Sequence, residues 1–207
     1  MDSNITGQTN DEQLKLLINQ INLNKNPNNN NSDLDVDFPK VIEFLPHLIG
    51  KTHLVQPKFK LSKNREATIA IGIPTIKREK TSYLLETVKS VLDAMNELEK
   101  SDALIVIMIA TFDDERYIQA TIESLSKEFK YELDSGLLEI IVPPNEFYPD
   151  FTKIEKDKVF NDSNDRVKWR TKQNYDFSYL MTYGQKRSKY YLQVILKIKK
   201  FKSLSQN

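Results

Sequence analysis

Short apolar runs alternate with amphipathic segments through the middle of the chain, and this alternation most constrains its fold. Three runs are rich in aliphatic residues: 67–73 (ATIAIGI), 103–110 (ALIVIMIA) and 137–142 (LLEIIV). Such runs are typical of buried strands, and residues 190–196 form a fourth candidate. Strands that alternate with helices require crossover connections. The sequence therefore predicts an α/β, Rossmann-like fold with a mostly parallel sheet that is incomplete at its C-terminal end.

The segments between these runs have the apolar spacing of amphipathic helices. We expect helices over residues 82–98, 116–129 and 174–188. Residues 145–166 are expected to connect the third strand to the last helix. The basic stretch from Arg166 to Lys172 is expected to form a loop that leads into this helix. We predict that the strand after the helix is buried.

The length and composition allow one folded domain. The chain has 207 residues, of which 39% are hydrophobic, so it can bury one sizeable core. Residues 1–40 are polar and asparagine-rich, and we predict that they are disordered because they bury too little apolar surface. The domain is expected over residues 41–196, with irregular chain at its start and a basic tail over residues 197–207.

Charge and composition disfavour several classes of function. The formal net charge is +1, so no global field points to an anionic membrane, and we expect no nucleic-acid partner. The chain has no cysteine, which excludes a disulfide framework and a thiolate metal site. No run approaches the roughly 18 apolar residues that a membrane span needs. The first residues lack the pattern of a signal peptide, so the chain as written is expected to have no route into the secretory pathway.

Ligands of parallel sheets bind beyond the carboxyl ends of the strands, which directs attention to the loop after the first strand. There, Thr75 offers a hydroxyl, and Lys77 and Arg78 could neutralise a diphosphate. The same residues also fit a solvated basic turn that caps a helix, so both interpretations stay open. The sequence contains neither a Gly-x-Gly-x-x-Gly pattern nor a Walker lysine loop.

Three carboxylates follow the second strand, at Asp113, Asp114 and Glu115. At a strand end they could bind a hard cation, a ribose hydroxyl or a uracil-type imide. Acids are equally favoured at the N-terminus of a helix, where Asp113 or Asp114 would be the N-cap. We expect one aspartate to cap the helix and the other to be available to a ligand.

Two further groups of residues have competing interpretations. Basic residues alternate with others between Arg166 and Lys172, around Trp169, and this pattern suggests an anion-binding face. An isolated basic patch on a near-neutral chain is weak support for nucleic-acid binding. The only histidines, His47 and His53, could ligate a metal as a pair, but two histidines without a nearby carboxylate favour packing instead.

Six blocks of the sequence closely resemble the N-acetylglucosaminyltransferase IV family, whose full name is alpha-1,3-mannosyl-glycoprotein 4-beta-N-acetylglucosaminyltransferase. They follow the family order and are LPHLIGKTHLVQP (45–57), GIPTIKRE (72–79), SGLLEIIVPP (135–144), FYPDF (147–151), RVKWRTKQNYD (166–176) and YYLQ (190–193). The resemblance implies a GT-A nucleotide-sugar-binding fold in a Golgi type II membrane protein. It also implies transfer of N-acetylglucosamine from UDP-N-acetylglucosamine to the α1,3-mannose arm of N-glycans, as a β1,4 branch. In such enzymes Mn²⁺ bridges the diphosphate to an acidic motif.

The resemblance and the loop positions together give five candidate donor-binding residues. Thr75 and Arg78 would lie near the diphosphate. Asp113 would lie near the uridine, and Lys172 and Gln173 would lie beside the sugar. We assign no catalytic residue and no metal-binding residue.

One departure from the family pattern limits the expected activity. In the family, the strand that matches YYLQ runs through one apolar residue into a Glu-Asp-Asp metal motif. Here Ile195, Leu196 and Lys197 stand in those places, and neither aliphatic side chains nor an ammonium can ligate Mn²⁺. We therefore expect an inactive fragment, the nucleotide-binding half of such an enzyme. We attribute its end to truncation, a retained intron or an error in the gene model.

The alternative hypothesis is a non-catalytic relative that binds and modulates active glycosyltransferases through an apolar surface. By family, the expected partners are a nucleotide sugar and an N-glycan acceptor, and the expected location is the Golgi membrane or lumen. A chain expressed as written is instead expected to be cytosolic.

Overall fold

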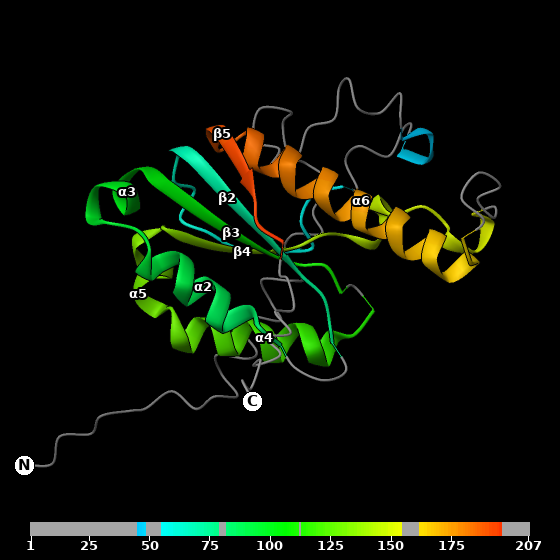
Figure 1. The fold of residues 1–207 in the computed structure, drawn as a ribbon, viewed down its shortest axis with the longest axis horizontal. Coiled ribbons are helices and arrows are strands. Elements are labelled where there is room, and N and C mark those ends of the chain that lie inside the picture. The colour runs from blue at the N-terminus through cyan, green and yellow to red at the C-terminus, as the bar shows by residue number, and fades with distance from the viewer. Residues whose placement is uncertain (1–44, 49–54, 79–81, 112, 155–161, 196–207) are drawn as a thin grey trace, which may run out of the picture. The chain divides into compact units, whose positions relative to one another are not determined.

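The fold is seen in a computed structural model that describes residues 45–48, 55–78, 82–111, 113–154 and 162–195 (Figure 1). Four predictions fall wholly or partly outside the described residues: the disorder of residues 1–40, the basic tail over 197–207, the role of His53, and the loss of the metal motif at Leu196 and Lys197.

The described strands form one five-stranded sheet in the order β1-β4-β3-β2-β5 (Figure 1). They are β1 (Phe59–Leu61), β2 (Ala67–Thr75), β3 (Ala103–Ile109), β4 (Leu138–Val142) and β5 (Ser188–Gln193). The pairs β2–β3, β2–β5 and β3–β4 are parallel, and β1 pairs antiparallel with β4. The predicted α/β fold with a mostly parallel sheet is confirmed. Its assignment to the GT-A fold stays a prediction.

Helices cover both faces of this sheet. They are α2 (Leu84–Asp93), α3 (Glu97–Asp102), α4 (Glu115–Glu128), α5 (Lys130–Ser135) and α6 (Asn164–Gln185), with 3-10 turns at Pro46–Leu48, Asn145–Phe147 and Phe151–Lys153. Figure 1 shows α2 and α4 along one face and α6 along the other. Among the described helices, none has the length and apolar character needed to cross a bilayer.

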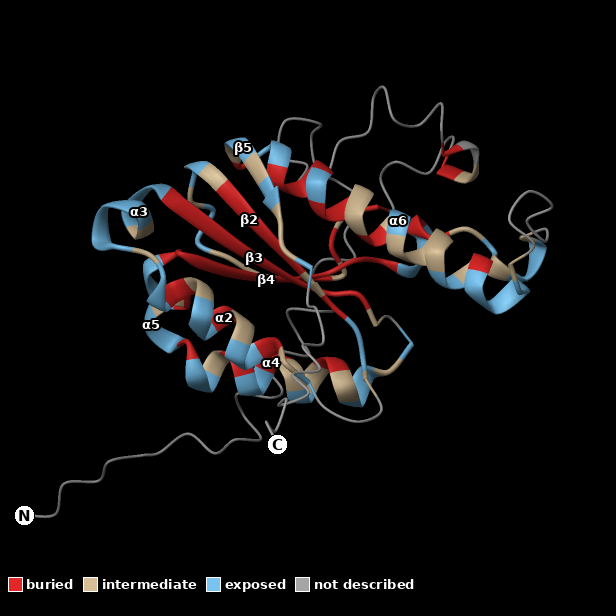
Figure 2. Ribbon diagram, viewed as in Figure 1, coloured by how far each residue is buried: buried red, intermediate tan, exposed pale blue. Residues whose placement is uncertain are grey.

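The core lies on both sides of β3, which is buried along its whole length (Figure 2). Successive side chains of a strand point to opposite faces. Leu104, Val106 and Met108 join a buried cluster that includes residues of α6, such as Tyr179 and Leu180. The intervening isoleucines of β3 are also buried, and the alternation places them on the opposite face, along which α2 and α4 lie. An apolar run without alternation is what a strand covered on both faces requires.

Strand β5 differs from its prediction, because it is an edge strand. It pairs only with β2 among the described strands, and it spans Ser188–Gln193 rather than residues 190–196. Tyr190 is 57% exposed and Leu192 is 50% exposed. The expectation of a buried strand is therefore wrong, since no described helix covers the side that these two residues face.

Two glycines allow α6 to pack closely on β2 and β5. The ring of Tyr191 on β5 lies between Gly72 on β2 and Gly184 on α6. A Cβ at Gly184 would stand 2.6 Å from Cδ2 of Tyr191, and one at Gly72 would collide with the Tyr191 hydroxyl. That hydroxyl donates to Oε1 of Gln193 at 2.6 Å, and Nε2 of Gln193 donates to the carbonyl of Gly72 at 3.2 Å.

The single helix predicted over residues 82–98 is two helices, α2 and α3. Asn96 begins α3 with a capping box: its Oδ1 accepts from the Glu99 amide at 3.0 Å. In return, Oε2 of Glu99 accepts from the Asn96 amide at 2.8 Å. This reciprocal pair satisfies two amides at a helix start and favours a new helix there. Leu98, the last residue of the predicted helix, is 81% exposed.

Helix α6 begins at Asn164, ten residues before its predicted start at residue 174. Ser163 caps it by accepting from the Arg166 amide at 3.3 Å. The predicted basic loop from Arg166 to Lys172 is therefore wrong, because these residues form the first turns of the helix. Helix α4 confirms the prediction over residues 116–129, whereas the short α5, which ends at the left-handed Gly136, was not predicted.

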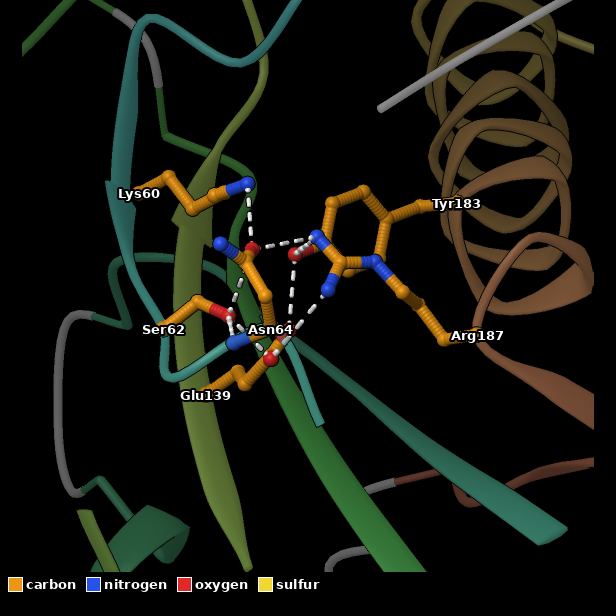
Figure 3. Close-up of polar contacts among 6 residues, drawn as sticks. All are labelled: Lys60, Ser62, Asn64, Glu139, Tyr183 and Arg187. Atoms are coloured by element: carbon orange, nitrogen blue, oxygen red, sulfur yellow. Dashed lines mark hydrogen bonds and ion pairs between the residues drawn. The ribbon is translucent and has the colours of Figure 1, made fainter. Parts of the chain in front are cut away.

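A buried polar cluster joins α6 to the amino ends of β4 and β5 (Figure 3). Glu139 of β4 is fully buried and accepts hydrogen bonds from Ser62 and, at 2.7 Å, from the Tyr183 hydroxyl. Nη1 of Arg187 lies 3.7 Å from Oε1 of Glu139. Nη2 of Arg187 also donates to Oδ1 of Asn64 at 3.2 Å. These contacts compensate for the burial of both charges.

Candidate functional site

A cleft of about 620 Å³ opens where the carboxyl ends of β2 and β3 meet α6. Its size is within the range of about 300–1,000 Å³ that is usual for small-molecule sites. It is lined by Ile76, Lys77, Ala110, Thr111, Asp113, Asp114, Phe151, Lys168, Trp169 and Lys172. The cleft thus adjoins two of the four strand ends at which the sequence analysis expects a ligand.

One face of α6 supplies the basic and aromatic wall of the cleft. Lys168, Trp169 and Lys172 share this face, because residues three and four apart on a helix are neighbours. Trp169 is 55% exposed. The predicted anion-binding stripe is not continuous, because Arg166 and Arg170 both pair with Asp162 and only the two lysines line the cleft. The Asp162 contacts are 3.3 Å to Arg166 Nε and 2.8 Å to Arg170 Nη2.

Lys172 is fixed at the end of β3. Its Nζ donates to the carbonyl of Ala110 at 2.7 Å and to both carboxylate oxygens of Asp176 at 2.9 Å. The ammonium also lies 5.1 Å from the ring centroid of Tyr148, within the range of a cation–π contact. Lys172 therefore ties α6 to the end of β3 at the wall of the cleft.

Asp176 is the buried partner in this arrangement. Its burial raises the pKa of the carboxyl group, and the adjacent Lys172 ammonium and Tyr148 hydroxyl oppose that rise. The Tyr148 hydroxyl donates to Oδ1 of Asp176 at 2.6 Å. Burial, together with the Asp176 charge, holds the pKa of Tyr148 well above its usual range, so this hydroxyl remains a donor. Neither residue is among the five donor-binding residues predicted from the sequence.

The acidic loop after β3 divides its two aspartates as expected. Asp114 caps α4 by accepting from the Tyr117 amide at 3.0 Å, which confirms that one aspartate is the N-cap. Asp114 also pairs with Nζ of Lys77 at 2.6 Å. The hydrogen bond from Lys77 lowers the pKa of Asp114, and the same contact raises the pKa of Lys77. Asp113 is exposed and lines the cleft, and its binding of a ligand stays a prediction.

The cleft brings together two of the five predicted donor-binding residues, Asp113 and Lys172. Thr75 ends β2 with its side chain buried, and its carbonyl accepts from the Ala110 amide at 2.7 Å. Arg78 and Gln173 are half-buried and are not among the residues that line the cleft. The ligand-binding roles of all five stay predictions.

The described histidine, His47, lies away from the cleft lining. Its Nε2 lies 2.8 Å from the carbonyl of Phe147, and its ring centroid lies 5.5 Å from that of Tyr175. These contacts place His47 in the packing between the 3-10 turns and α6. Within the described ranges, no three histidine or carboxylate side chains are grouped closely enough to hold a metal ion.

Comparisons with known proteins agree with the resemblance in the sequence. The family described as the MGAT4 conserved region matches residues 36–204. Alpha-1,3-mannosyl-glycoprotein 4-beta-N-acetylglucosaminyltransferase A of Rattus norvegicus is 43% identical over 157 residues, which cover 75% of this chain and 29% of that protein. The A form of Gallus gallus is 42% identical with the same coverage. The B form of Danio rerio is 40% identical, with 75% and 28% coverage.

The chain therefore spans about 29% of the length of the A-form relatives. No solved structure matches the fold.

Proposed function

The chain belongs to the N-acetylglucosaminyltransferase IV family, and from this premise we propose that it forms the nucleotide-sugar-binding part of such a transferase. The cleft at the carboxyl ends of β2 and β3 is the observation that carries this proposal. It combines lysines, an exposed carboxylate and an exposed indole, which suit the phosphates, the polar edge and the flat ring of a nucleotide.

The donor in this proposal is UDP-N-acetylglucosamine, and the acceptor is a mannosyl glycoprotein. The names of the relatives support both, since they describe N-acetylglucosamine transfer to such glycoproteins. The proposal keeps Thr75 and Arg78 near the diphosphate, Asp113 near the uridine, and Lys172 and Gln173 beside the sugar. It includes a GT-A fold and a Golgi location for the family enzyme.

Lys168 is the lysine of the cleft that is best placed to receive a phosphate. Lys172 is held by Ala110 and Asp176, and Lys77 is paired with Asp114. Within the part of the chain that the structure describes, no carboxylate pairs with Lys168. A charge-assisted bond from this ammonium to a diphosphate would be shorter and stronger than a neutral one.

The residue types at the family's metal position, Ile195, Leu196 and Lys197, do not fit a divalent cation, and the structure describes only Ile195 of the three. After β5, the Val194 amide donates to the Gly72 carbonyl at 2.9 Å, and the side chain of Ile195 is 59% exposed. An aliphatic side chain has no donor atom for Mn²⁺. We therefore assign no step to a metal, and we propose that this chain alone does not transfer the sugar.

Calorimetric titration with UDP-N-acetylglucosamine tests the binding proposal. We expect saturable binding that Lys168→Ala weakens about tenfold, because a hydrogen bond to a charged group contributes about 1.5 kcal/mol or more. Lys130→Ala is the matched control, since Lys130 is 78% exposed on α5 and pairs only locally with Asp134. Absence of binding, or equal loss in both variants, overturns the proposal.

A second function is favoured by the exposed side of β5. Tyr190 and Leu192 face the same side of the sheet edge and are each at least half exposed. We propose that this apolar strip binds a full-length transferase of the family and modulates it. Co-purification with the A-form relative should be lost in a Tyr190→Lys/Leu192→Lys variant. Retention of the complex by that variant would exclude the strip as the interface.

A further inference from the structure

Trp169 is a large aromatic side chain that the fold leaves exposed at a cleft. It is the only tryptophan of the chain, and 55% of it remains exposed on α6. Buried tryptophans usually contribute much apolar surface to a core, whereas this one contributes to the lining of a cavity. Phe151 and Ile76 also line the cleft, and Ile76 is 37% exposed. One part of the cleft therefore offers an apolar, aromatic surface.

Polar groups of opposite charge accompany this surface. Lys168 precedes Trp169 on the helix, and Asp113 lines the same cleft from the loop after β3. A nucleoside diphosphate has a matching division, with a flat base that carries N–H donors at one end and anionic phosphates at the other. Aromatic side chains bind bases by stacking, and this contact does not depend on the identity of the base.

We propose that Trp169 is the residue on which the base of the nucleotide stacks, with Asp113 accepting a hydrogen bond from the base. Lys168 faces the phosphates in this arrangement. The inference rests on the proposed function, because it requires a nucleotide in the cleft. It adds a binding residue that the five sequence-predicted positions do not include, and it assigns the apolar part of the cleft to the base rather than to the sugar.

The single tryptophan makes the stacking directly measurable. All tryptophan emission of the protein comes from residue 169, so a base stacked on this indole quenches the emission of the whole chain. We expect UDP and uridine to quench the fluorescence in a saturable manner. Inorganic pyrophosphate should compete with UDP without quenching. N-acetylglucosamine alone should leave the emission unchanged, and strong quenching by this sugar would overturn the assignment of the surface to the base.

Calorimetry of two variants provides a second readout that does not depend on emission. Trp169→Ala should weaken UDP binding about tenfold, as expected for the loss of one base–aromatic stack. Trp169→Phe should retain most of the affinity, because a phenyl ring can still stack. Both variants should bind pyrophosphate like the unmodified chain. Tyr131→Ala is the control, since Tyr131 is 79% exposed on α5 and does not line the cleft.

The outcomes separate this inference from the proposed function. If UDP binds but leaves the emission unchanged, and Trp169→Ala binds it normally, the stacking is overturned while nucleotide binding stands. If no nucleotide binds the unmodified chain, both the stacking and the proposed function are overturned. Circular dichroism should show unchanged folding of each variant, because the substituted side chain is largely exposed.

Discussion

At the scale of single residues, an ion pair between Lys172 and the buried Asp176 fixes the position of one residue in the wall of the cleft. Asp176 holds the Lys172 ammonium against the Ala110 carbonyl at the end of β3, and Tyr148 satisfies the same carboxylate. A buried charge is tolerated when it is paired and hydrogen-bonded. The wall of the cleft therefore contains a lysine whose position is fixed before any ligand binds and whose charge is largely balanced by Asp176.

The pH dependence of stability should report the burial of Asp176. Burial raises its pKa in the folded chain, so the folded state binds this proton more tightly than the unfolded state does. Its contribution to the free energy of unfolding is thus lost as the pH rises above about 3.8, the ordinary pKa of the group. The neutral Asp176→Asn variant lacks this titration.

Urea unfolding of both proteins at several pH values provides the measurement. We expect the stability of the unmodified chain, relative to Asp176→Asn, to fall as the pH rises through that window. A relative stability that rises with pH would show that ionisation is favoured in the folded chain and would contradict this account.

Only part of this residue-level arrangement could be predicted from the sequence. Lys172 and Asp176 are four residues apart, so their pairing follows once both are placed on one helix. The predicted boundary between loop and helix separates the two residues, so the pair could not be predicted. The contact between Tyr148 and Asp176 joins residues 28 positions apart, and it depends on how the chain after β4 packs against α6.

At the scale of elements, the close approach of α6 to the sheet depends on two glycines, which have no side chain. Gly72 and Gly184 leave room for the ring of Tyr191, which lies between the strand and the helix. Its burial raises the pKa of the Tyr191 hydroxyl above the usual range. A tyrosine between two glycines thus sets the spacing at which α6 contributes its basic face to the cleft.

The effect of Gly184→Ala should change sign with the residue at position 191. In the unmodified background we expect a loss of about 1–3 kcal/mol in unfolding free energy, because the new methyl group overpacks the Tyr191 ring. In a Tyr191→Ala background the same change should stabilise by about 1 kcal/mol, the helix preference of alanine over glycine. Denaturant unfolding of the four proteins gives both values. Equal effects in the two backgrounds would exclude the proposed contact.

The strands were more predictable than the helix boundaries, for a physical reason. β3 is buried on both faces, so its apolar run is visible in the sequence without knowledge of its neighbours. The starts of α3 and α6 depend on the caps Asn96 and Ser163, whose short polar side chains also suit loops. The exposure of β5 could not be predicted, because a Tyr-Tyr-Leu sequence suits an edge strand and a buried strand equally well.

At the scale of the whole described fold, polar groups at the two ends of the strands have different roles. In the cluster at the amino ends, Glu139, Tyr183 and Arg187 are buried and bonded to protein partners (Figure 3). None of these residues lines the cleft. The cleft at the carboxyl ends retains exposed charged groups. We assign stability to the first end and ligand binding to the second.

Substitutions in the Glu139 cluster should affect folding without affecting the cleft directly. Arg187→Ala leaves the fully buried Glu139 carboxylate without its cation, which we expect to cost about 3–5 kcal/mol in unfolding free energy. The double variant Glu139→Leu/Arg187→Leu should be more stable than Arg187→Ala, because it removes both charges. Thermal unfolding of the three proteins measures this order, and a double variant less stable than the single one would contradict it.

Backbone hydrogen exchange with and without UDP-N-acetylglucosamine tests the central claim most directly, because it locates the ligand on the fold. We predict added protection at the carboxyl ends of β2 and β3, in the acidic loop around Asp113, and in the first turns of α6 around Trp169. The amino end of the sheet around Glu139 should be unchanged. Protection confined to that end, or no change anywhere at saturating ligand, would contradict the assignment of the cleft to a nucleotide sugar.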